Sequence, residues 1–290
     1  MPSLRAAGLL TAFLICTMIG IPWQASALRF RLERRKTFPQ RYHRFLCWMF
    51  GIRVTQIGMP ADGQGVLIVA NHTSYFDILV LSSLAPVSFV ARSDVLDWPL
   101  FGTLSKLQET VFVERSRRTQ TGEARDQIRE RLLAGDTLVL FPEGTSDDGN
   151  CVLPFKSALM GAVEAEIGQD DKGGVRHVTV QPVSISYVGL HGMPMGRENR
   201  PFFAWYGDME LVPHLWEAIK AGPIDVVVEF HPPIDVDSAG GRKALAVAAE
   251  NIIRRGQTRA LSQYRGNSAE PAAAPATDDA GAPQLAEAVA

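Results

Sequence analysis

The chain has 290 residues, of which 46% are hydrophobic and 21% are charged. This composition holds ample apolar material for a core, and it excludes a collagen, a coiled coil and a fully disordered chain. Lys and Arg number 29 against 31 Asp and Glu, so the net charge of −2 does not favour nucleic acid. The three cysteines, Cys16, Cys47 and Cys151, are too few and too far apart for a disulfide framework or a C-x-x-C metal pair, which favours a reducing compartment.

The first predicted element is a membrane helix. Residues 6–28 carry no charge, and 23 residues at about 1.5 Å each span the roughly 30 Å of a bilayer core. A cleaved secretory signal is the alternative, because Ala25-Ser26-Ala27 fits an A-x-A cleavage site. The uncharged stretch is long for a signal, and the cations after it oppose translocation. The sequence therefore favours an uncleaved anchor in the inner membrane, with the body of the protein on the cytoplasmic side.

A basic segment follows the predicted anchor. Between Arg29 and Arg44 there are seven Lys or Arg residues against the single acid Glu33, whereas only Arg5 precedes the anchor. The rest of the chain then holds 22 bases and 30 acids, so its body is acidic and no nucleic-acid partner is expected. Residues 29–58 are predicted to form a basic amphipathic collar against anionic lipid head groups. Its interfacial aromatic residues would be Trp23, Tyr42 and Trp48.

Short β-branched runs alternate with helical patterns through residues 59–265. The predicted strands are Val66–Ala70, Val87–Ala91, Thr110–Val113, Thr137–Phe141, Val178–Tyr187 and Asp225–Phe230. The predicted helices are Tyr75–Leu84, Trp98–Leu107, Gln120–Ala134, Lys156–Ile167, Pro213–Ala221 and Arg242–Arg255. Several strands are apolar enough to be buried on both faces. The pattern predicts an α/β domain with a mixed, largely parallel sheet and helices on both faces, preceded by the N-terminal membrane-associated helix.

The far end of the chain differs from this domain. Residues 266–290 are rich in Ala and Pro and contain no aromatic side chain, so they offer too little to bury and predict a disordered tail. The chain therefore divides into a membrane anchor (1–28), a basic collar (29–58), an α/β domain (59–265) and this tail.

The turn after the first predicted strand of the domain carries a His and an Asp. A hydroxyl that attacks a carbonyl must lose its proton, and His72 with Asp77 as its orienter can accept it. On one continuous helix the two side chains would point about 140° apart, so the pair forms only if His72 lies in the loop and Asp77 in the first helical turn. The structural alternative is a capping box, in which Ser74 caps the helix and Asp77 returns a bond. The two interpretations are compatible.

Two further strand ends carry polar side chains. The run from Glu114 to Arg118 follows a predicted strand, and its arginines can clamp an anionic head group or can be solvated surface charges. Glu143-Gly144-Thr145 follows the next strand with a carboxylate, a flexible residue and a hydroxyl, a set that in isolation is an ordinary turn. In sheets of this kind, ligands bind at the carboxyl ends of strands, where these residues lie.

Together these residues resemble the glycerolipid acyltransferases, and the lysophosphatidate acyltransferases in particular. The family's H-x-x-x-x-D motif is present as His72 to Asp77, and its F-P-E-G-T motif as Phe141 to Thr145. An apolar pair followed by an acidic residue and Arg lies at Val111 to Arg115, and an apolar strand with a central proline lies at Val180 to Val183. The four blocks keep the family's order. Each is weak alone, but the ordered set is specific.

The resemblance implies acyl transfer from an acyl carrier protein or coenzyme A thioester to a lysolipid hydroxyl at a membrane, with His72 as general base and Asp77 as orienter. The residues that would hold the acceptor head group are Arg115, Glu143, Gly144 and Thr145. The sequence contains no G-x-S-x-G elbow, no cysteine in these loops and no paired histidine spacing, so no covalent nucleophile, metal or other cofactor is expected. The Trp98–Leu107 helix can line an acyl groove, although its periodicity fits ordinary core better.

One position departs from the lysophosphatidate pattern. Those enzymes usually read F-P-E-G-T-R, in which the Arg helps to bind the acceptor phosphate, whereas this chain has Ser146 followed by Asp147 and Asp148. Such a set disfavours a phosphomonoester dianion and suits an acceptor with an amine. The segment from Gly144 to Lys156 resembles the bacterial branch that includes lyso-ornithine lipid acyltransferases. The sequence narrowly favours that acceptor, and lysophosphatidate is the alternative because the nearby arginine cluster can bind phosphate.

Two rivals come from other classes of protein. One is a membrane-tethered lipid-binding protein with relic motifs, and the other is a lipid hydrolase. The complete set of His72, Asp77 and Glu143 argues against a relic. Turnover with an acyl thioester and a lysolipid, compared with water as acceptor, separates the three.

Overall fold

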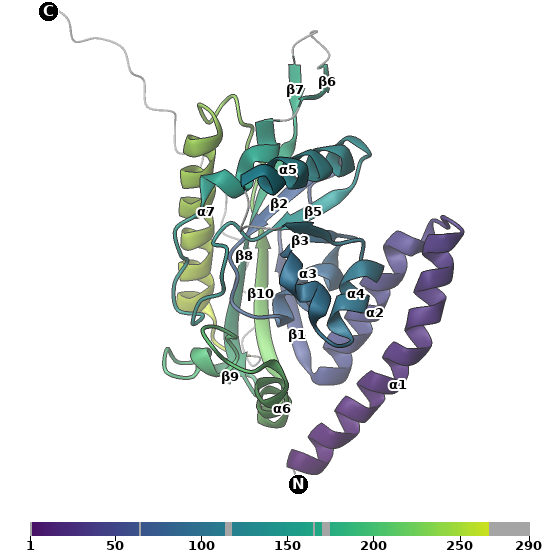
Figure 1. Cartoon of the computed structure of the whole chain (residues 1–290). Coiled ribbons are helices and arrows are strands. Elements are labelled where there is room, and N and C mark those ends of the chain that lie inside the picture. The colour runs from purple at the N-terminus through teal and green to yellow at the C-terminus, as the bar shows by residue number, and fades with distance from the viewer. Residues whose placement is uncertain (1, 64, 114–117, 165, 170–174, 267–290) are drawn as a thin grey trace, which may run out of the picture.

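The computed structural model of the protein describes residues 2–63, 65–113, 118–164, 166–169 and 175–266 (Figure 1). Its α-helices are α1 (Pro2–Arg29), α2 (Arg34–Phe50), α3 (Phe76–Leu84), α4 (Phe101–Leu107), α5 (Arg118–Leu133), α6 (Leu211–Ala221) and α7 (Arg242–Gln263). Short 3₁₀ helices are η1 (Ser93–Asp97), η2 (Ser157–Glu164) and η3 (Arg200–Phe202). Its strands are β1 (Ile52–Ile57), β2 (Val66–Ala70), β3 (Ser88–Arg92), β4 (Val111–Val113), β5 (Thr137–Leu140), β6 (Glu166–Gln169), β7 (Val175–His177), β8 (Thr179–Leu190), β9 (Met193–Pro194) and β10 (Ile224–Phe230).

The strands of the main sheet lie in the order β1-β10-β8-β2-β5-β3-β4. Every neighbouring pair from β8 to β4 is parallel, and β10 is antiparallel to β8. All five residues of β2 are buried, because β2 lies between β5 and β8 in the middle of the sheet. The predicted mixed, largely parallel sheet is confirmed, and each of the six predicted strands forms with both ends within three residues of the prediction.

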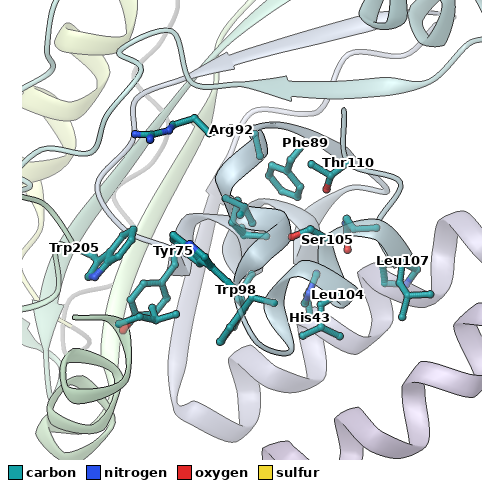
Figure 2. Close-up of a pocket in the computed structure, with 18 of the residues that line it drawn as sticks. His43, Tyr75, Phe89, Arg92, Trp98, Leu104, Ser105, Leu107, Thr110 and Trp205 are labelled. Atoms are coloured by element: carbon teal, nitrogen blue, oxygen red, sulfur yellow. The ribbon is translucent and has the colours of Figure 1, made fainter. Parts of the chain in front are cut away.

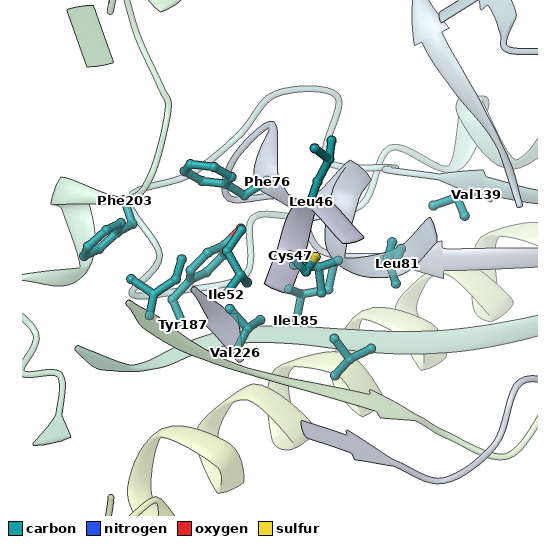
Figure 3. Close-up of a cluster of buried hydrophobic side chains, with 14 of the residues drawn as sticks. Leu46, Cys47, Ile52, Phe76, Leu81, Val139, Ile185, Tyr187, Phe203 and Val226 are labelled. Carbon is teal, nitrogen blue, oxygen red and sulfur yellow. The ribbon is translucent and has the colours of Figure 1, made fainter. Parts of the chain in front are cut away.

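Helices cover both faces of the sheet, as predicted. Along β2, Val66, Ile68 and Ala70 join the hydrophobic cluster closed by α2, α3 and α6. Figure 3 shows part of this cluster. The alternate residues, Leu67 and Val69, join the cluster on the other face, which α5 and α7 close. This period of two follows from the pleat of a strand. Because apolar clusters cover both faces, polar side chains can gather only at the ends of strands such as β2 and β5.

The N-terminal helix α1 lies beside α2 at one side of the molecule and also contacts α4 and α6 (Figure 1). Its buried side chains form one stripe at helical spacing, namely Ala6, Phe13, Thr17, Gln24 and Ala27. Its outward face exposes large apolar side chains, which include Leu14, Ile15, Met18, Ile19 and Trp23. Among the described residues, α1 is the one helix long and apolar enough to cross a membrane. The predicted N-terminal apolar helix is therefore present as a candidate membrane element.

Several segments differ from the sequence prediction: η1, β7 and β9 were not predicted, and α7 runs to Gln263 rather than to Arg255. Residues 29–58, expected as a collar, hold α2 and also β1, which pairs in parallel with β10 at the edge of the sheet. Residues 156–167, expected as one α-helix, form η2 and then enter β6. Gly161 lowers the helix propensity of this run, and Met160 interrupts it with a non-helical backbone. Of the predicted tail, residues 267–290 lie outside the described residues.

Candidate active site

The candidate catalytic pair lies where β2 ends. His72 lies in the loop after β2, and Asp77 is the second residue of α3. His72 Nδ1 and Asp77 Oδ2 are 2.9 Å apart. The geometry that the sequence required, with the His in the loop and the Asp in the first turn, is therefore observed. The side chain of His72 is 22% exposed, whereas that of Asp77 is fully buried.

The carboxylate of Asp77 has four hydrogen-bond partners. Its Oδ2 accepts the backbone N–H groups of Thr73 at 2.7 Å and Ser74 at 2.9 Å, in addition to His72. Its Oδ1 accepts the hydroxyl of Tyr187 at 2.7 Å. Because an ionised carboxylate only accepts, Nδ1 of His72 carries the ring proton and Nε2 presents a lone pair. Burial and the charge of Asp77 raise the pKa of Tyr187 well above its usual value, so this phenol stays a donor.

The predicted capping box at Ser74 is only half formed. Asp77 returns its bond to the N–H of Ser74, as expected. The hydroxyl of Ser74, in contrast, is buried and has no hydrogen-bond partner among the described residues, so the prediction that Ser74 caps the helix is wrong. The helix α3 begins at Phe76, so Tyr75 rather than Ser74 occupies the N-cap position, and it makes no side-chain cap bond.

Two neighbours fix the direction of the His72 loop. The side-chain amide of Asn71 donates to the carbonyl of Ile185 at 2.9 Å and accepts its N–H at 2.8 Å. These two bonds tie the residue that follows β2 to the neighbouring strand β8. The ring of His72 stacks on Phe141, with centroids 4.2 Å apart and planes at 19°. The imidazole is therefore held between a carboxylate and an aromatic face.

Glu143 supports the backbone of His72. Its side chain is 1% exposed, and Oε1 accepts the N–H of His72 at 3.2 Å. Burial, and after it the negative charge of Asp147, raises the pKa of Glu143 to about 9. The pKa of Asp147 is itself raised to about 7, chiefly by burial. Glu143 is therefore protonated at neutral pH, and it lies behind the imidazole rather than in the open part of the site.

The loop after β5 is fastened to the loop after β2. The backbone N–H of Asp147 donates to the carbonyl of His72 at 3.0 Å. The side-chain Oδ1 of Asp147 accepts the hydroxyl of Thr73 at 3.3 Å. Ser146, at the position where the family resemblance leads one to expect Arg, donates its hydroxyl to the carbonyl of Trp205. The N–H of Trp205 donates to the carbonyl of Thr73 at 2.9 Å. A third segment, around Trp205, is thereby fastened beside the candidate catalytic pair.

A cavity of about 430 Å³ opens beside His72 (Figure 2). One part is lined by side chains of α1, α2 and α4, among them Phe13, Phe38, Leu46, Leu104 and Leu107. Another part is lined by polar and aromatic residues near His72, among them Gly144, Thr145, Ser146, Tyr75 and Trp205. The predicted Trp98–Leu107 segment contributes Trp98, Phe101, Leu104 and Leu107, so it lines a groove as well as filling space.

Sequence reasoning missed several contacts of this site. Tyr187 reaches Asp77 from 110 positions away, and Trp205 reaches Thr73 from a different part of the chain. A single sequence carries no signal for either pair, because strand order and loop docking set both. Arg115, predicted as a head-group ligand, lies outside the described residues.

The fold and this site define an acyltransferase, and comparisons with known proteins agree. The family model named Acyltransferase matches residues 51–186. The chain is 48% identical to the lyso-ornithine lipid O-acyltransferase of Brucella abortus over 81% of this chain and 86% of that protein. It is 44% identical to the protein of the same name from Rhizobium meliloti, over 82% and 81%. The chain therefore belongs to the acyltransferase family, and it is an enzyme that acylates a lysolipid.

More distant similarities extend the comparison. The 1-acyl-sn-glycerol-3-phosphate acyltransferase of Neisseria gonorrhoeae is 30% identical over 69% of this chain and 72% of that protein. The crystal structure of the 1-acyl-sn-glycerophosphate acyltransferase PlsC from Thermotoga maritima matches with a TM-score of 0.62, over 89% of this chain and 94% of that chain. At 22% sequence identity, this structural match shows a common fold.

Proposed function

We propose that the chain transfers a fatty acyl group from an acyl thioester, on acyl carrier protein or coenzyme A, to the hydroxyl of lyso-ornithine lipid. The observation that carries this choice of acceptor is Ser146, a neutral residue whose hydroxyl is engaged with a backbone carbonyl and which Asp147 and Asp148 follow. A neutral side chain at this point of the cavity lining offers little to a phosphomonoester dianion and is compatible with a head group that carries an ammonium. Relatives that are 48% and 44% identical carry the matching name.

His72 is the general base in this proposal. Its Nδ1 is held by Asp77, so Nε2 takes the proton of the acceptor hydroxyl as that oxygen attacks the thioester carbonyl. When the tetrahedral intermediate collapses, the C–S bond breaks and the imidazolium returns the proton to the leaving thiolate. Asp77 stays ionised and stabilises the imidazolium while it exists. The acyl group passes directly from sulfur to oxygen.

The other predicted site residues take different roles. Glu143 is a positioning residue, because its carboxyl holds the N–H of His72. Gly144 and Thr145 line the cavity beside His72 and are proposed to contact the acceptor. Arg115 is proposed to clamp the carboxylate of the ornithine head group, as the family motif implies. The apolar walls from α1, α2 and α4 are proposed to receive an acyl chain.

We also propose that α1 lies in the cytoplasmic leaflet of the inner membrane rather than crossing it. A buried stripe packs α1 against α2, α4 and α6, which leaves one outward face for lipid. Trp23 lies on that face, and the guanidinium of Arg34 is 4.4 Å from its ring centre. Tryptophan and cationic side chains are typical of the layer of lipid head groups at a membrane surface. The cations that follow Arg29 support the cytoplasmic side.

Lysophosphatidate is the second candidate acceptor. The observation that favours it is the 30% identity to the 1-acyl-sn-glycerol-3-phosphate acyltransferase of Neisseria gonorrhoeae. The test is a competition in mixed micelles, in which purified enzyme meets equal amounts of both lysolipids and one labelled acyl thioester. We expect ornithine lipid to be the main product. Phosphatidic acid as the main product would overturn the proposed acceptor.

A further inference from the structure

Three aromatic rings meet at the polar part of the cavity. Tyr75 comes from the turn before α3, Trp98 follows η1, and Trp205 lies between η3 and α6 (Figure 2). The ring centroids of Tyr75 and Trp205 are 6.0 Å apart at an interplanar angle of 63°, and those of Trp98 and Trp205 are 5.4 Å apart at 83°. All three side chains are partly exposed and line the cavity. We call these three rings the aromatic corner.

The polar atoms of the aromatic corner are used to hold it in place. The indole N–H of Trp205 donates to the carbonyl of Met209 at 2.9 Å, and its backbone is held by Ser146 and Thr73. The hydroxyl of Tyr75 is 2.8 Å from Nδ1 of His214. These contacts occupy the polar atoms of Tyr75 and Trp205, so these two side chains offer a ligand ring surface rather than a donor.

The charges that the structure describes around the aromatic corner do not favour an anion. Among the described residues that line the cavity, the charged side chains besides histidine are Arg92 and Asp94, and they pair with each other at 2.9 Å. The segment after Trp205 carries the exposed acids Asp208 and Glu210. A ring face is the negative end of the aromatic quadrupole, so it attracts an ammonium and repels a phosphate dianion.

We propose that Tyr75, Trp98 and Trp205 form the subsite for the ammonium group of the acceptor, and this rests on the proposed lyso-ornithine lipid function. Tyr75 is three residues from His72, so an acceptor bound here has its head group beside the catalytic loop. Ser146 is a positioning residue for this subsite, since its hydroxyl fastens the Trp205 segment. The residue found in place of the family's phosphate-binding Arg thus holds an ammonium-binding ring in position.

The test compares two acceptors that differ at one group, lyso-ornithine lipid and the same lipid with its free amine acetylated, which removes the positive charge and adds a small neutral amide. Wild type should prefer the free amine by about tenfold in kcat/KM, a factor typical of a partly desolvated cation on aromatic faces. Trp205→Leu should abolish that preference through KM, and Trp205→Phe should retain part of it. Trp48→Leu is the matched control, because Trp48 is 76% exposed on α2 and should leave the ratio unchanged.

The outcomes separate the subsite from the proposed function. An equal loss by Trp205→Leu on both acceptors, with the wild-type ratio kept, would show that the corner is packing only and would overturn the subsite. Turnover of lysophosphatidate alone would overturn the proposed acceptor instead. In that case lyso-ornithine lipid and its acetylated form are used as inhibitors of the lysophosphatidate reaction. Inhibition constants that differ by about tenfold and converge in Trp205→Leu support the subsite, and equal constants overturn it.

Discussion

The two parts of the cavity are built in different ways. Around His72, single hydrogen bonds between defined atoms fix each group, and Asp77 alone accepts four of them. Along α1, α2 and α4, the walls are apolar side chains such as Phe13 and Leu104, which contribute area rather than particular bonds. Under the proposed mechanism, one substitution in the polar part removes a defined step of the chemistry, whereas one in the apolar part removes a fraction of a surface.

The difference suits the two tasks that the proposed function gives to this cavity. Proton transfer needs the base and its orienter in fixed geometry, which buried and satisfied polar groups provide. Holding chains of variable length needs a wall that tolerates small changes, which apolar helices provide. The polar part is therefore expected to lose activity at single substitutions, and the helical part only by degrees.

The largest effect is expected for His72→Ala. Loss of the proposed general base should lower kcat by about 10²–10⁴-fold, because general acid–base assistance is typically of that size. His72 is partly exposed in a loop, so thermal unfolding should stay close to that of wild type. Steady-state kinetics with acyl thioester and lysolipid are the measurement. Wild-type turnover by the folded variant would end the proposed mechanism.

Tyr187→Phe should have the next largest effect. It removes the donor to Oδ1 of Asp77 and leaves a buried carboxylate short of one bond, at a cost of about 1–3 kcal/mol in stability and about tenfold in kcat. The matched control is Ser186→Ala in the same strand, since the hydroxyl of Ser186 is buried without a partner among the described residues. Chemical denaturation and kcat should separate the two variants. Equal behaviour would mean that Tyr187 only fills space.

The sequence predicts some features of the fold and the candidate site and not others, and the two groups differ in whether they depend on local or on distant residues. The His72–Asp77 geometry, the strands and the two covered faces were predictable, because they depend on local spacing and on apolar runs. The contacts of Tyr187 and Trp205 were not, since they depend on which strands become neighbours and where a distant loop docks. Glu143 was expected to face the head group, and its burial behind His72 depends on how the β5 loop packs.

Ser146→Arg should change selectivity more than rate. The new cation should shift the ratio of kcat/KM for lysophosphatidate over lyso-ornithine lipid by about 1–3 kcal/mol, the value of one charge-assisted contact. Ser146→Ala is the control, because it removes the bond to Trp205 without adding charge. It should weaken lyso-ornithine lipid and leave lysophosphatidate poor. A uniform loss on both acceptors in Ser146→Arg would report a blocked cavity and contradict the charge argument.

Glu143→Gln should alter the pH dependence of stability. The pKa of Glu143 is raised in the folded state to about 9, so the stability present at low pH is lost as pH rises from about 4.5 towards 9. Gln has the same shape and does not ionise, so the variant should lose less stability over that window, by up to about 1.4 kcal/mol for each pH unit. Denaturation at pH 6 and pH 8.5 is the measurement. Parallel curves for both proteins would show that Glu143 is not neutral when folded.

The smallest effect is expected for Ile19→Ser on the outward face of α1. Ile19 is 68% exposed, so the change should leave thermal unfolding unaltered and weaken partition to anionic vesicles by about 1 kcal/mol, part of the value of one buried apolar side chain. Phe13→Ala on the opposite face is the comparison, because Phe13 is buried and packs on Phe50 with ring centroids 5.9 Å apart. That variant should lose stability while its outward face stays intact. If Ile19→Ser binds vesicles as tightly as wild type, and deleting residues 1–28 does not release the protein, α1 is not the surface that meets the lipid.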